Sequence, residues 1–325
     1  MSGSVLAVTD LSVRLPGRAG KVTVVDRVSF EVGRGQCMGI VGESGSGKSM
    51  TGYALMGLVG VDGHEVSGAA VLGGRDLLAL APARMREMRG NRIAMVFQDP
   101  MMTLNPVLRI DTQMVEAVQA HARVGRTESL RMAAEALARV GLPDPGRRLK
   151  EYPHQLSGGM RQRVAIALAL INKPDLIICD EPTTALDATT QAHIVAEVRR
   201  LCREDGTALI WVSHDLELVA AIADKIGVMY AGRLVENGTA AQVLGQPRHP
   251  YTVALLACMP SRQRHGLDLL QIRGRMPLAH EIPSGCGFRT RCDYASERCN
   301  AVPGTSAWHG HAVRCFHPLS VQEAA

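Results

Sequence analysis

The segment Gly42–Ser49 restricts the fold of this 325-residue chain more than any other feature. It reads GESGSGKS and satisfies the spacing G-x-x-x-x-G-K-[ST] at every position. The short apolar run Cys37–Val41 comes just before it and a helical pattern follows, so the segment connects a buried parallel strand to a helix. Glycine-rich turns of this kind surround phosphate groups with backbone N–H groups, and the helix N-terminus attracts negative charge. The sequence therefore predicts an α/β fold with a phosphate-binding loop, the P-loop.

The P-loop predicts a nucleotide site. Lys48 is expected to reach the β- and γ-phosphates, and Ser49 is expected to coordinate Mg²⁺. The expected ATP- and Mg²⁺-binding residues of this segment are Gly42, Ser44, Gly45, Ser46, Gly47, Lys48, Ser49 and Met50. A glycine-rich turn before an ordinary helix is the alternative interpretation, but the complete motif and its context argue against it.

A second apolar strand, 176–179, ends in two acidic residues. Asp180 is placed to hold Mg²⁺, directly or through water, and Glu181 to polarise the attacking water. Many buried strands end in an acidic residue, so this pattern is informative only because a P-loop lies upstream.

A serine and two glycines precede a third apolar segment. They belong to the run Ser157, Gly158, Gly159 and Met160, after which 164–171 continues as an apolar helix. Such a helix start binds phosphate without a lysine. Two chains packed head to tail would use it, each completing the γ-phosphate site of the other. The simpler interpretation is that Ser157 is a helix N-cap.

With these motifs, about the first 245 residues resemble the ABC ATPase family. Residues 156–160 match its signature, and Gln98 matches the Q-loop glutamine that contacts Mg²⁺ and the attacking water. Ala185–Leu186–Asp187 matches the D-loop, with Asp187 as its aspartate, and His214 matches the switch histidine at the γ-phosphate. The resemblance implies an ABC-type P-loop NTPase with a helical signature subdomain at about 99–165. It also implies that the catalytic residues are Glu181, His214 and Gln98.

One position departs from the family pattern. Leu15 stands where the family usually has an aromatic residue that stacks on adenine. Adenine is therefore expected to pack on aliphatic carbon, from Leu15 and Val24.

The expected helical subdomain contains an amphipathic stretch. Thr127 is the predicted N-cap of its helix. An apolar stripe of four residues is expected to form the subdomain core: Leu130, Ala134, Leu137 and Ala138. By the resemblance, the surface around residues 99–110 meets membrane subunits. Met101 and Met102 suit such an interface, and buried packing is nearly as plausible for them.

The last 80 residues differ in composition from the rest. Residues 246–325 hold nine Arg and no Lys against five Asp plus Glu, so they carry +4 of the chain's net charge of +5. The motifs at 248–252 and 283–292 resemble the C-terminal region of peptide-importer ATPases, the dipeptide, oligopeptide and nickel branch. The predicted division is a nucleotide-binding domain at 1–245 and a small, loop-rich cysteine region at 246–325.

Half of the eight cysteines cluster in this region: Cys286, Cys292, Cys299 and Cys315. Four thiolates in one short segment suit a tetrahedral sulfur site for zinc or an iron–sulfur cluster, with free thiols or disulfides as a third option. The resemblance favours a [4Fe–4S] cluster. His309, His311 and His317 are alternative ligands, although solvated loop positions are the preferred interpretation.

The four arginines beside the cysteines have two interpretations. Arg289, Arg291, Arg298 and Arg314 are expected either to donate to cluster sulfurs or to make the region soluble. The other four cysteines, Cys37, Cys179, Cys202 and Cys258, are expected to be inert packing.

The resemblance implies an ATPase subunit that powers import of di- or oligopeptides or similar small solutes. The implied partners are a second, related ATPase subunit, two integral membrane permease subunits and an extracytoplasmic solute-binding protein. No apolar run reaches about 18 residues and the start lacks a secretory pattern, so the chain is expected to stay in the cytosol. The resemblance implies a peripheral position on the cytoplasmic face of the inner membrane. The alternative is a soluble ABC ATPase that acts on nucleic acid or ribosomes. The 3% aromatic content and the single cassette argue against it.

Overall fold

The computed structural model describes residues 4–17, 20–59, 63–184, 186–262 and 270–320. The described chain forms two compact units. The first contains residues 4–6, 32–37 and 79–211, and the second contains residues 7–31, 38–78 and 212–320, apart from the gaps just given.

The first unit is built on three buried strands, β6 (Ile93–Val96), β7 (Leu176–Asp180) and β8 (Ala208–Ser213). Their order is β8-β7-β6, and β6 and β7 are parallel, with Val96 opposite Cys179. Every residue of the three strands is buried, which explains why each strand is a nearly continuous apolar run. The predicted strand that ends at Asp180 is therefore confirmed.

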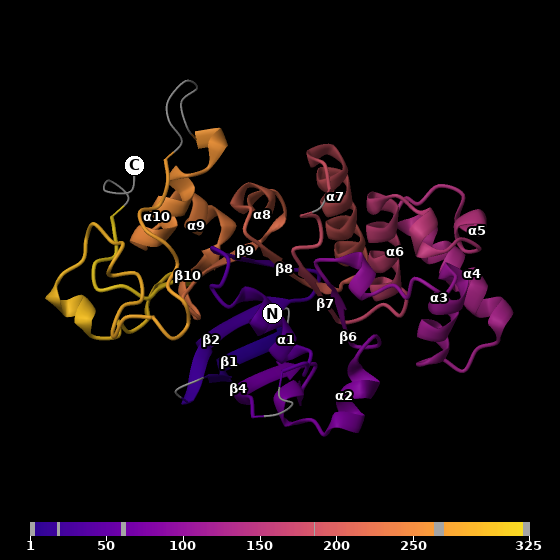
Figure 1. Ribbon diagram of the computed structural model, residues 1–325, viewed down its shortest axis with the longest axis horizontal. Coiled ribbons are helices and arrows are strands. Elements are labelled where there is room, and N and C mark those ends of the chain that lie inside the picture. Colours follow the sequence, from indigo (N-terminus) through magenta and orange to yellow (C-terminus); the bar gives the residue numbers. More distant parts are fainter. Residues whose placement is uncertain (1–3, 18–19, 60–62, 185, 263–269, 321–325) are drawn as a thin grey trace. The chain divides into compact units, whose positions relative to one another are not determined.

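Helices α3, α4 and α6 of the first unit pack on one another (Figure 1). The helices of this unit are α2 (Pro82–Met88), α3 (Ile110–Gln119), α4 (Arg126–Arg139), α5 (Pro145–Arg148), α6 (Gly158–Leu170) and α7 (Ala188–Asp205). Single 3₁₀ turns lie at η2 (Pro100–Met102) and η3 (Pro153–Gln155). The predicted helical subdomain thus contains real helices, and α6 begins at the serine–glycine motif.

The buried face of α4 differs from the predicted stripe. The helix begins at Arg126 with Gly125 as its cap, so Thr127 is inside the helix and is not the N-cap. The buried residues are Ser129, Ala133 and Leu137, and Ala138 is exposed. The Ser129 hydroxyl donates to the Gly125 carbonyl oxygen at 3.0 Å, which lets a polar residue occupy the buried face. The buried face could not be recognised from the apolar pattern alone, because one of its three positions is a serine.

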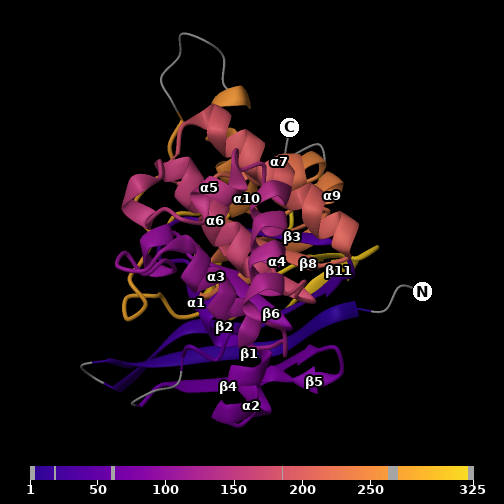
Figure 2. The ribbon, with the colours of Figure 1, turned by 90° about the vertical axis from the view of Figure 1, so that its right-hand side faces the viewer.

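The second unit contains most of a four-stranded sheet in the order β2-β1-β4-β5 (Figure 2). Its strands are β1 (Ser4–Gly17), β2 (Gly20–Gly33), β4 (Glu65–Leu72) and β5 (Arg75–Asp76). Strands β1 and β2 belong to this unit except for residues 4–6 and 32–33. A second set of strands has the order β11-β12-β10-β9-β3. These are β3 (Cys37–Val41), β9 (Lys225–Tyr230), β10 (Arg233–Thr239), β11 (Ser306–Trp308) and β12 (His311–Val313). Strands β3 and β9 are parallel, and the remaining pairs are antiparallel.

The helices of the second unit are α1 (Lys48–Leu55), α8 (Leu216–Ile222), α9 (Ala240–Gly245) and α10 (Pro250–Ala257). Short 3₁₀ turns lie at η1 (Leu77–Ala79), η4 (Pro260–Arg262) and η5 (Glu297–Asn300). Apart from η5 and the short strands β11 and β12, residues 270–320 are turns and loops. Within the described ranges, none of the helices combines the length and the apolar character that crossing a bilayer requires.

Candidate functional site: the P-loop and its surroundings

The P-loop connects β3 to α1, and two of its glycines are fixed by close backbone neighbours. Gly42 has a φ of 154°, and a Cβ atom there would lie 2.1 Å from the Met229 carbonyl oxygen. Gly47, the cap of α1, has a φ of 102°, and a Cβ atom there would lie 2.6 Å from the Val24 carbonyl oxygen. Only glycine fits these positions, because the neighbouring atoms belong to the backbone and cannot turn away.

Lys48 is buried inside the loop, only 4% exposed. Its Nζ atom donates to the Gly42 carbonyl oxygen at 2.8 Å and to the Glu43 carbonyl oxygen at 3.0 Å. Ser44 and Gly45 are exposed at the tip of the loop, Ser46 is buried, and Ser49 and Met50 are half-buried. The loop therefore holds a cation beneath an accessible glycine-rich turn, which is the arrangement that a phosphate site needs.

Glu43 is held by residues from the distant C-terminal part of the chain. Its backbone N–H donates to the Tyr251 hydroxyl at 3.0 Å. Its carboxylate accepts two hydrogen bonds from the Arg291 guanidinium, at 2.9 and 3.1 Å. Sequence reasoning missed both contacts, because 208 and 248 residues separate the partners.

In the first unit, the predicted catalytic residues follow the ends of two paired strands. Gln98 comes two residues after Val96, and Glu181 comes two residues after Cys179, the partner of Val96 in the parallel register. Both therefore lie at the carboxyl edge of β6 and β7. Gln98 is exposed and Glu181 is half-buried, whereas Asp180 at the end of β7 is 2% exposed.

Glu181 has an unusual backbone conformation for a residue with a side chain. Its φ is 44°, in the left-handed region. Thr184 supports it from one turn away, since the Thr184 hydroxyl donates to the Glu181 carbonyl oxygen at 3.0 Å and lies 3.3 Å from its Oε2. Backbone strain of this kind concentrates at functional sites because only a supporting structure can maintain it.

The signature serine caps α6. The Ser157 hydroxyl accepts the Met160 N–H at 3.3 Å and is exposed, while Gly158 and Gly159 form the first turn. Asp187 caps α7 by accepting the Thr190 N–H at 2.9 Å, and this backbone hydrogen bond lowers the pKa of its carboxyl.

Two further predicted residues are Ala185 and His214. The D-loop residue Ala185 lies outside the described residues. His214, in the second unit, directly follows β8 and is exposed. The neighbouring Asp215 caps α8 by accepting the Leu218 N–H at 3.0 Å, which fixes the start of the helix beside the histidine.

The four clustered cysteines line one small cavity of about 10 Å³, together with Phe288, Phe316 and other residues of the second unit. A water molecule needs roughly 10–15 Å³, so this cavity is almost closed. Among the described residues, no group of three or more His, Cys, Asp or Glu side chains is placed to hold a metal ion. The predicted metal-binding site is therefore not supported, although the four thiols do gather as expected.

Burial affects three of the clustered cysteines, Cys286, Cys292 and Cys315, by raising the pKa of their thiols. The His317 backbone N–H donates to the Cys315 sulfur at 3.3 Å. Burial raises the pKa of the Cys286 and Cys292 thiols, and backbone N–H groups, among them those of Phe288 and Tyr294, oppose the shift. Burial raises the pKa of the Cys315 thiol to about 11, and repulsion from the other three cysteines adds to the shift.

The arginines near the cysteines bind other partners in the described part of the chain. Arg291 pairs with Glu43, Arg289 donates to the Ser284 carbonyl oxygen at 3.0 Å, and Arg298 lies over the Phe316 ring. The Arg314 guanidinium lies 3.4 Å from the Thr305 hydroxyl. The expectation that they donate to cluster sulfurs is not supported, because their geometry is already set by these oxygens and rings.

His311 is also not the solvated loop residue that we expected. It lies on β12 with its side chain 4% exposed, and its Nε2 atom is 2.7 Å from Glu236 Oε1. Glu236 also accepts the backbone N–H groups of Arg248 and His249, both at 2.8 Å. A buried carboxylate on β10 thus organises three donors, which explains why a histidine is buried here. Of the scattered cysteines, Cys37, Cys179 and Cys202 are buried, and Cys258 is half-buried.

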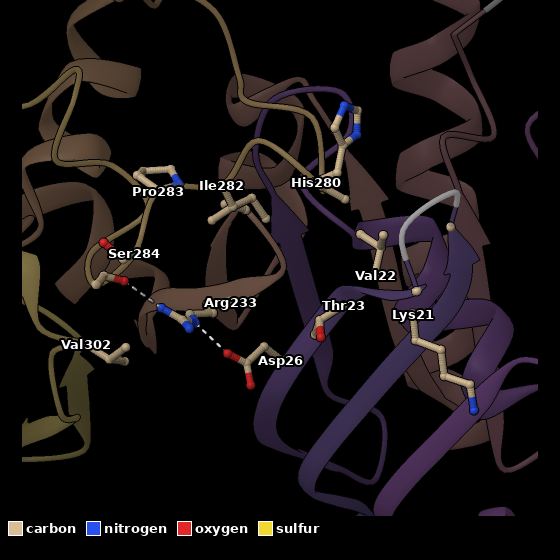
Figure 3. A pocket seen from close by; sticks show the side chains of 15 residues that line it. Lys21, Val22, Thr23, Asp26, Arg233, His280, Ile282, Pro283, Ser284 and Val302 are labelled. Carbon is tan, nitrogen blue, oxygen red and sulfur yellow. Dashed lines mark hydrogen bonds and ion pairs between the residues drawn. The ribbon is translucent and has the colours of Figure 1, made fainter.

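A larger cavity of about 870 Å³ lies between the start of β2 and the 279–285 segment. Figure 3 shows Arg233 reaching across it to Asp26, at 2.7 Å, while the same guanidinium donates to the Gly285 carbonyl oxygen at 3.0 Å. This arginine attaches the residue before Cys286 to the β2 strand.

Comparison with known proteins agrees with this architecture. The ABC transporter family model matches residues 25–184, and the model "Oligopeptide/dipeptide transporter, C-terminal region" matches residues 235–299. The solved dimer of the ATP-binding cassette MJ0796 in a post-hydrolysis state, bound to ADP and Pi, has a TM-score of 0.65 and 26% identity. That match covers 72% of this chain and 98% of the other. The fold is therefore that of an ABC ATPase, as predicted.

Two curated relatives match nearly the whole chain. The oligopeptide transport ATP-binding protein OppD of Salmonella typhimurium is 44% identical over 97% of this chain and 94% of its own length. The dipeptide transport ATP-binding protein DppD of Escherichia coli is 42% identical over 97% of each chain. The chain belongs to the ABC transporter family, in the branch of peptide-transport ATP-binding subunits, and hydrolyses ATP to drive transport. The alternative of a nucleic-acid or ribosome ATPase is not supported.

Proposed function

We propose that this chain supplies the ATP-driven step in the import of di- or oligopeptides. The observation that carries the proposal is the P-loop with its buried Lys48, in a chain whose full length matches peptide-transport ATP-binding proteins. The C-terminal family match adds support, because it covers residues 235–299, beyond the ABC transporter match at 25–184.

The proposed roles follow from the motif positions. Lys48 neutralises the β- and γ-phosphates of ATP, and Ser49 and Asp180 supply the oxygen ligands that Mg²⁺ prefers. Glu181 polarises the attacking water as general base, assisted by Gln98. His214 binds the γ-phosphate. Leu15 and Val24 pack against adenine, and the Val24 carbonyl oxygen already lies next to Gly47.

Two cassettes are needed, and we propose that the second is a related but different chain. The exposed hydroxyl of Ser157 and the turn Gly158–Met160 would meet the γ-phosphate bound at Lys48 of the partner. The solved MJ0796 cassette is a dimer, which supports a paired arrangement. Head-to-tail pairing satisfies both nucleotide sites at once.

We also propose a peripheral position on the cytoplasmic face of the inner membrane, with two permease subunits and an extracytoplasmic solute-binding protein. The exposed 3₁₀ turn η2 is the proposed contact with the permeases, since Met101 and Met102 are 38% and 76% exposed. Flexible methionines suit a surface that must adapt to a moving partner. In this scheme, residues 1–245 act as the nucleotide-binding domain and 246–325 as an attached C-terminal domain.

The experiment is transport by the complex reconstituted in proteoliposomes, with the permeases, the second ATPase and the binding protein present. Proteoliposomes that contain the wild-type complex should accumulate a labelled dipeptide only when ATP is supplied. Glu181→Gln should keep ATP binding but lower hydrolysis by roughly 10²- to 10⁴-fold, because the general base is lost. Normal ATP turnover by that variant would contradict the assignment of Glu181 as the general base. ATPase activity stimulated by DNA, and not by peptide-loaded binding protein, would contradict the import function.

The [4Fe–4S] cluster is proposed separately. Its support is that four thiols line one cavity and that the Cys315 sulfur accepts the His317 backbone N–H at 3.3 Å, in a soft donor set suited to iron–sulfur chemistry. A cluster is larger than one zinc ion, so its ligands stand further apart and the cavity must widen to receive it. The cluster would act as a structural cross-link of a region with little core of its own.

The test is the visible absorption spectrum, with iron and sulfide analysis, of protein purified without oxygen. A brown protein with iron and acid-labile sulfide is expected. Cys292→Ser should remove the colour, and Cys258→Ser, outside the cluster, should keep it. Colourless protein, or zinc without iron, would contradict the proposal.

A further inference from the structure

The second residue of the P-loop is held by the C-terminal region through both its backbone and its side chain. Tyr251 on α10 accepts the Glu43 N–H, and Arg291 binds the Glu43 carboxylate with two parallel hydrogen bonds. Glu43 in turn lies next to Lys48, which donates to the Glu43 carbonyl oxygen at 3.0 Å. The amide, carboxylate and carbonyl of a single residue thus connect the C-terminal region to the phosphate-binding lysine.

The Arg291 side chain has almost no freedom to move. It is 5% exposed, and its Nε atom donates to the Arg273 carbonyl oxygen at 2.7 Å. Its Nη1 atom lies 3.3 Å from the Tyr230 hydroxyl, and its guanidinium lies 5.8 Å from the Tyr230 ring centre. A planar guanidinium held on several sides directs the remaining N–H groups at one target, which a lysine cannot do.

Tyr251 is equally fixed. It is fully buried, and its ring packs edge-on against Tyr230 at 4.6 Å and beside Phe288 at 5.2 Å. Its hydroxyl therefore has a set position, and the Glu43 N–H that it accepts cannot shift without losing a hydrogen bond.

The charge of Glu43 gives the contact a second consequence. A carboxylate in the P-loop repels the phosphates of a nucleotide, and the repulsion is strong because the site is partly shielded from water. Arg291 neutralises this carboxylate with a short bidentate pair.

We propose that Arg291 and Tyr251 are positioning residues for ATP binding. They fix the start of the P-loop, hold the carbonyl that orients Lys48 and neutralise Glu43. The C-terminal region is thereby a working part of the nucleotide site. The proposal builds on the assignment of that site. Tyr251 and Arg291 lie in the C-terminal motifs at 248–252 and 283–292, and neither belongs to a nucleotide-binding motif of this chain.

The first test is the dissociation constant of ATP, measured by calorimetry on the full chain. Arg291→Met should weaken binding by about 2- to 30-fold, the range of contacts that act through a neighbour. Arg291→Lys should recover part of the loss because it restores the charge without the bidentate geometry. Arg275→Met is the matched control, since Arg275 lies in the same region with its side chain 83% exposed. Tyr251→Phe should weaken binding while leaving the ring packing intact.

A double-mutant cycle distinguishes positioning from general damage. In Glu43→Gln/Arg291→Met the contact is already gone and the carboxylate is neutral, so binding should be no weaker than in Arg291→Met alone. The KM for ATP should change more than kcat in the assembled transporter. Additive losses in the cycle would overturn the proposal, as would wild-type affinity in both Arg291→Met and Tyr251→Phe. If Arg291→Met does not fold, Tyr251→Phe and Glu43→Gln decide the question. Failure of the wild-type chain to bind ATP would instead overturn the nucleotide site itself.

Discussion

His249 should make the stability of this protein depend on pH between 7 and 5. The residue is 1% exposed, and burial lowers the pKa of its imidazole from 6.5 to about 4, against a smaller opposing effect of Glu236. Its Nδ1 atom accepts the Tyr251 N–H at 3.0 Å, so the folded state needs the neutral ring. The unfolded chain binds a proton at His249 below about pH 6.5, and the folded chain does not until about pH 4. Stability therefore falls as the pH falls through this window.

The magnitude follows from the two pKa values. The imidazole contributes about 2 kcal/mol less stability at pH 5 than at pH 7, and the full loss below pH 4 is about 3 kcal/mol. Other groups also titrate in this range, so the prediction concerns a difference between two proteins. His249→Asn keeps a side-chain oxygen to cap α10 but carries no titrating group.

The assay is urea unfolding of both proteins at pH 7 and pH 5. The wild type should lose about 2 kcal/mol more than His249→Asn on acidification. NMR titration of labelled histidine should show one imidazole that stays neutral at pH 5. Equal losses in the two proteins, or a His249 pKa near 6.5, would refute the argument that burial governs this residue.

Three further predictions concern packing and surface contacts. Gly42→Ala should abolish ATP binding, because its Cβ would lie 2.1 Å from the Met229 carbonyl oxygen, and calorimetry would show retained affinity if this were wrong. Leu137→Ala should lower the free energy of unfolding, measured in urea, by about 2–5 kcal/mol. Leu130→Ala should lower it less, because Leu137 is fully buried and Leu130 is not. Equal losses in the two variants would contradict the observed buried face of α4. Met102→Ser should change the unfolding free energy by less than about 0.5 kcal/mol. It should nevertheless reduce peptide-stimulated ATPase activity in the complex, and full stimulation would argue against contact of η2 with the permeases.

Local patterns were sufficient for the nucleotide motifs. The P-loop, the strand ending at Asp180 and the helix start at Ser157 each depend on a few adjacent residues, and their types and spacing are dictated by backbone geometry. Where a partner lay far along the chain, the sequence carried no such signal. Arg291 was expected either to donate to cluster sulfurs or to make the region soluble, yet its partner is Glu43, 248 residues away.

Buried polar residues account for two other differences from the sequence-based expectations, at α4 and at β12. Ser129 and His311 are polar types that usually face water, but each is satisfied by one specific acceptor, the Gly125 carbonyl and the Glu236 carboxylate. These hydrogen bonds depend on neighbours in the folded structure, so residue type alone did not show that the two positions are buried. The gathering of the four cysteines was predicted from their closeness along the chain, but the small volume of the cavity that they line could not be read from the sequence.

The pairing of β12 with β10 has a practical consequence for making shorter versions of this protein. β12 covers the open edge of β10, with Glu236 opposite Val313 and Asn237 opposite Ala312. A chain cut near residue 245 would leave that edge unpaired and strip the buried Glu236 of His311 and of two backbone donors. Unpaired edges bind the strands of other molecules. The truncated protein should therefore form insoluble aggregates. In the full chain, β12 is expected to prevent such self-association by occupying the edge of β10.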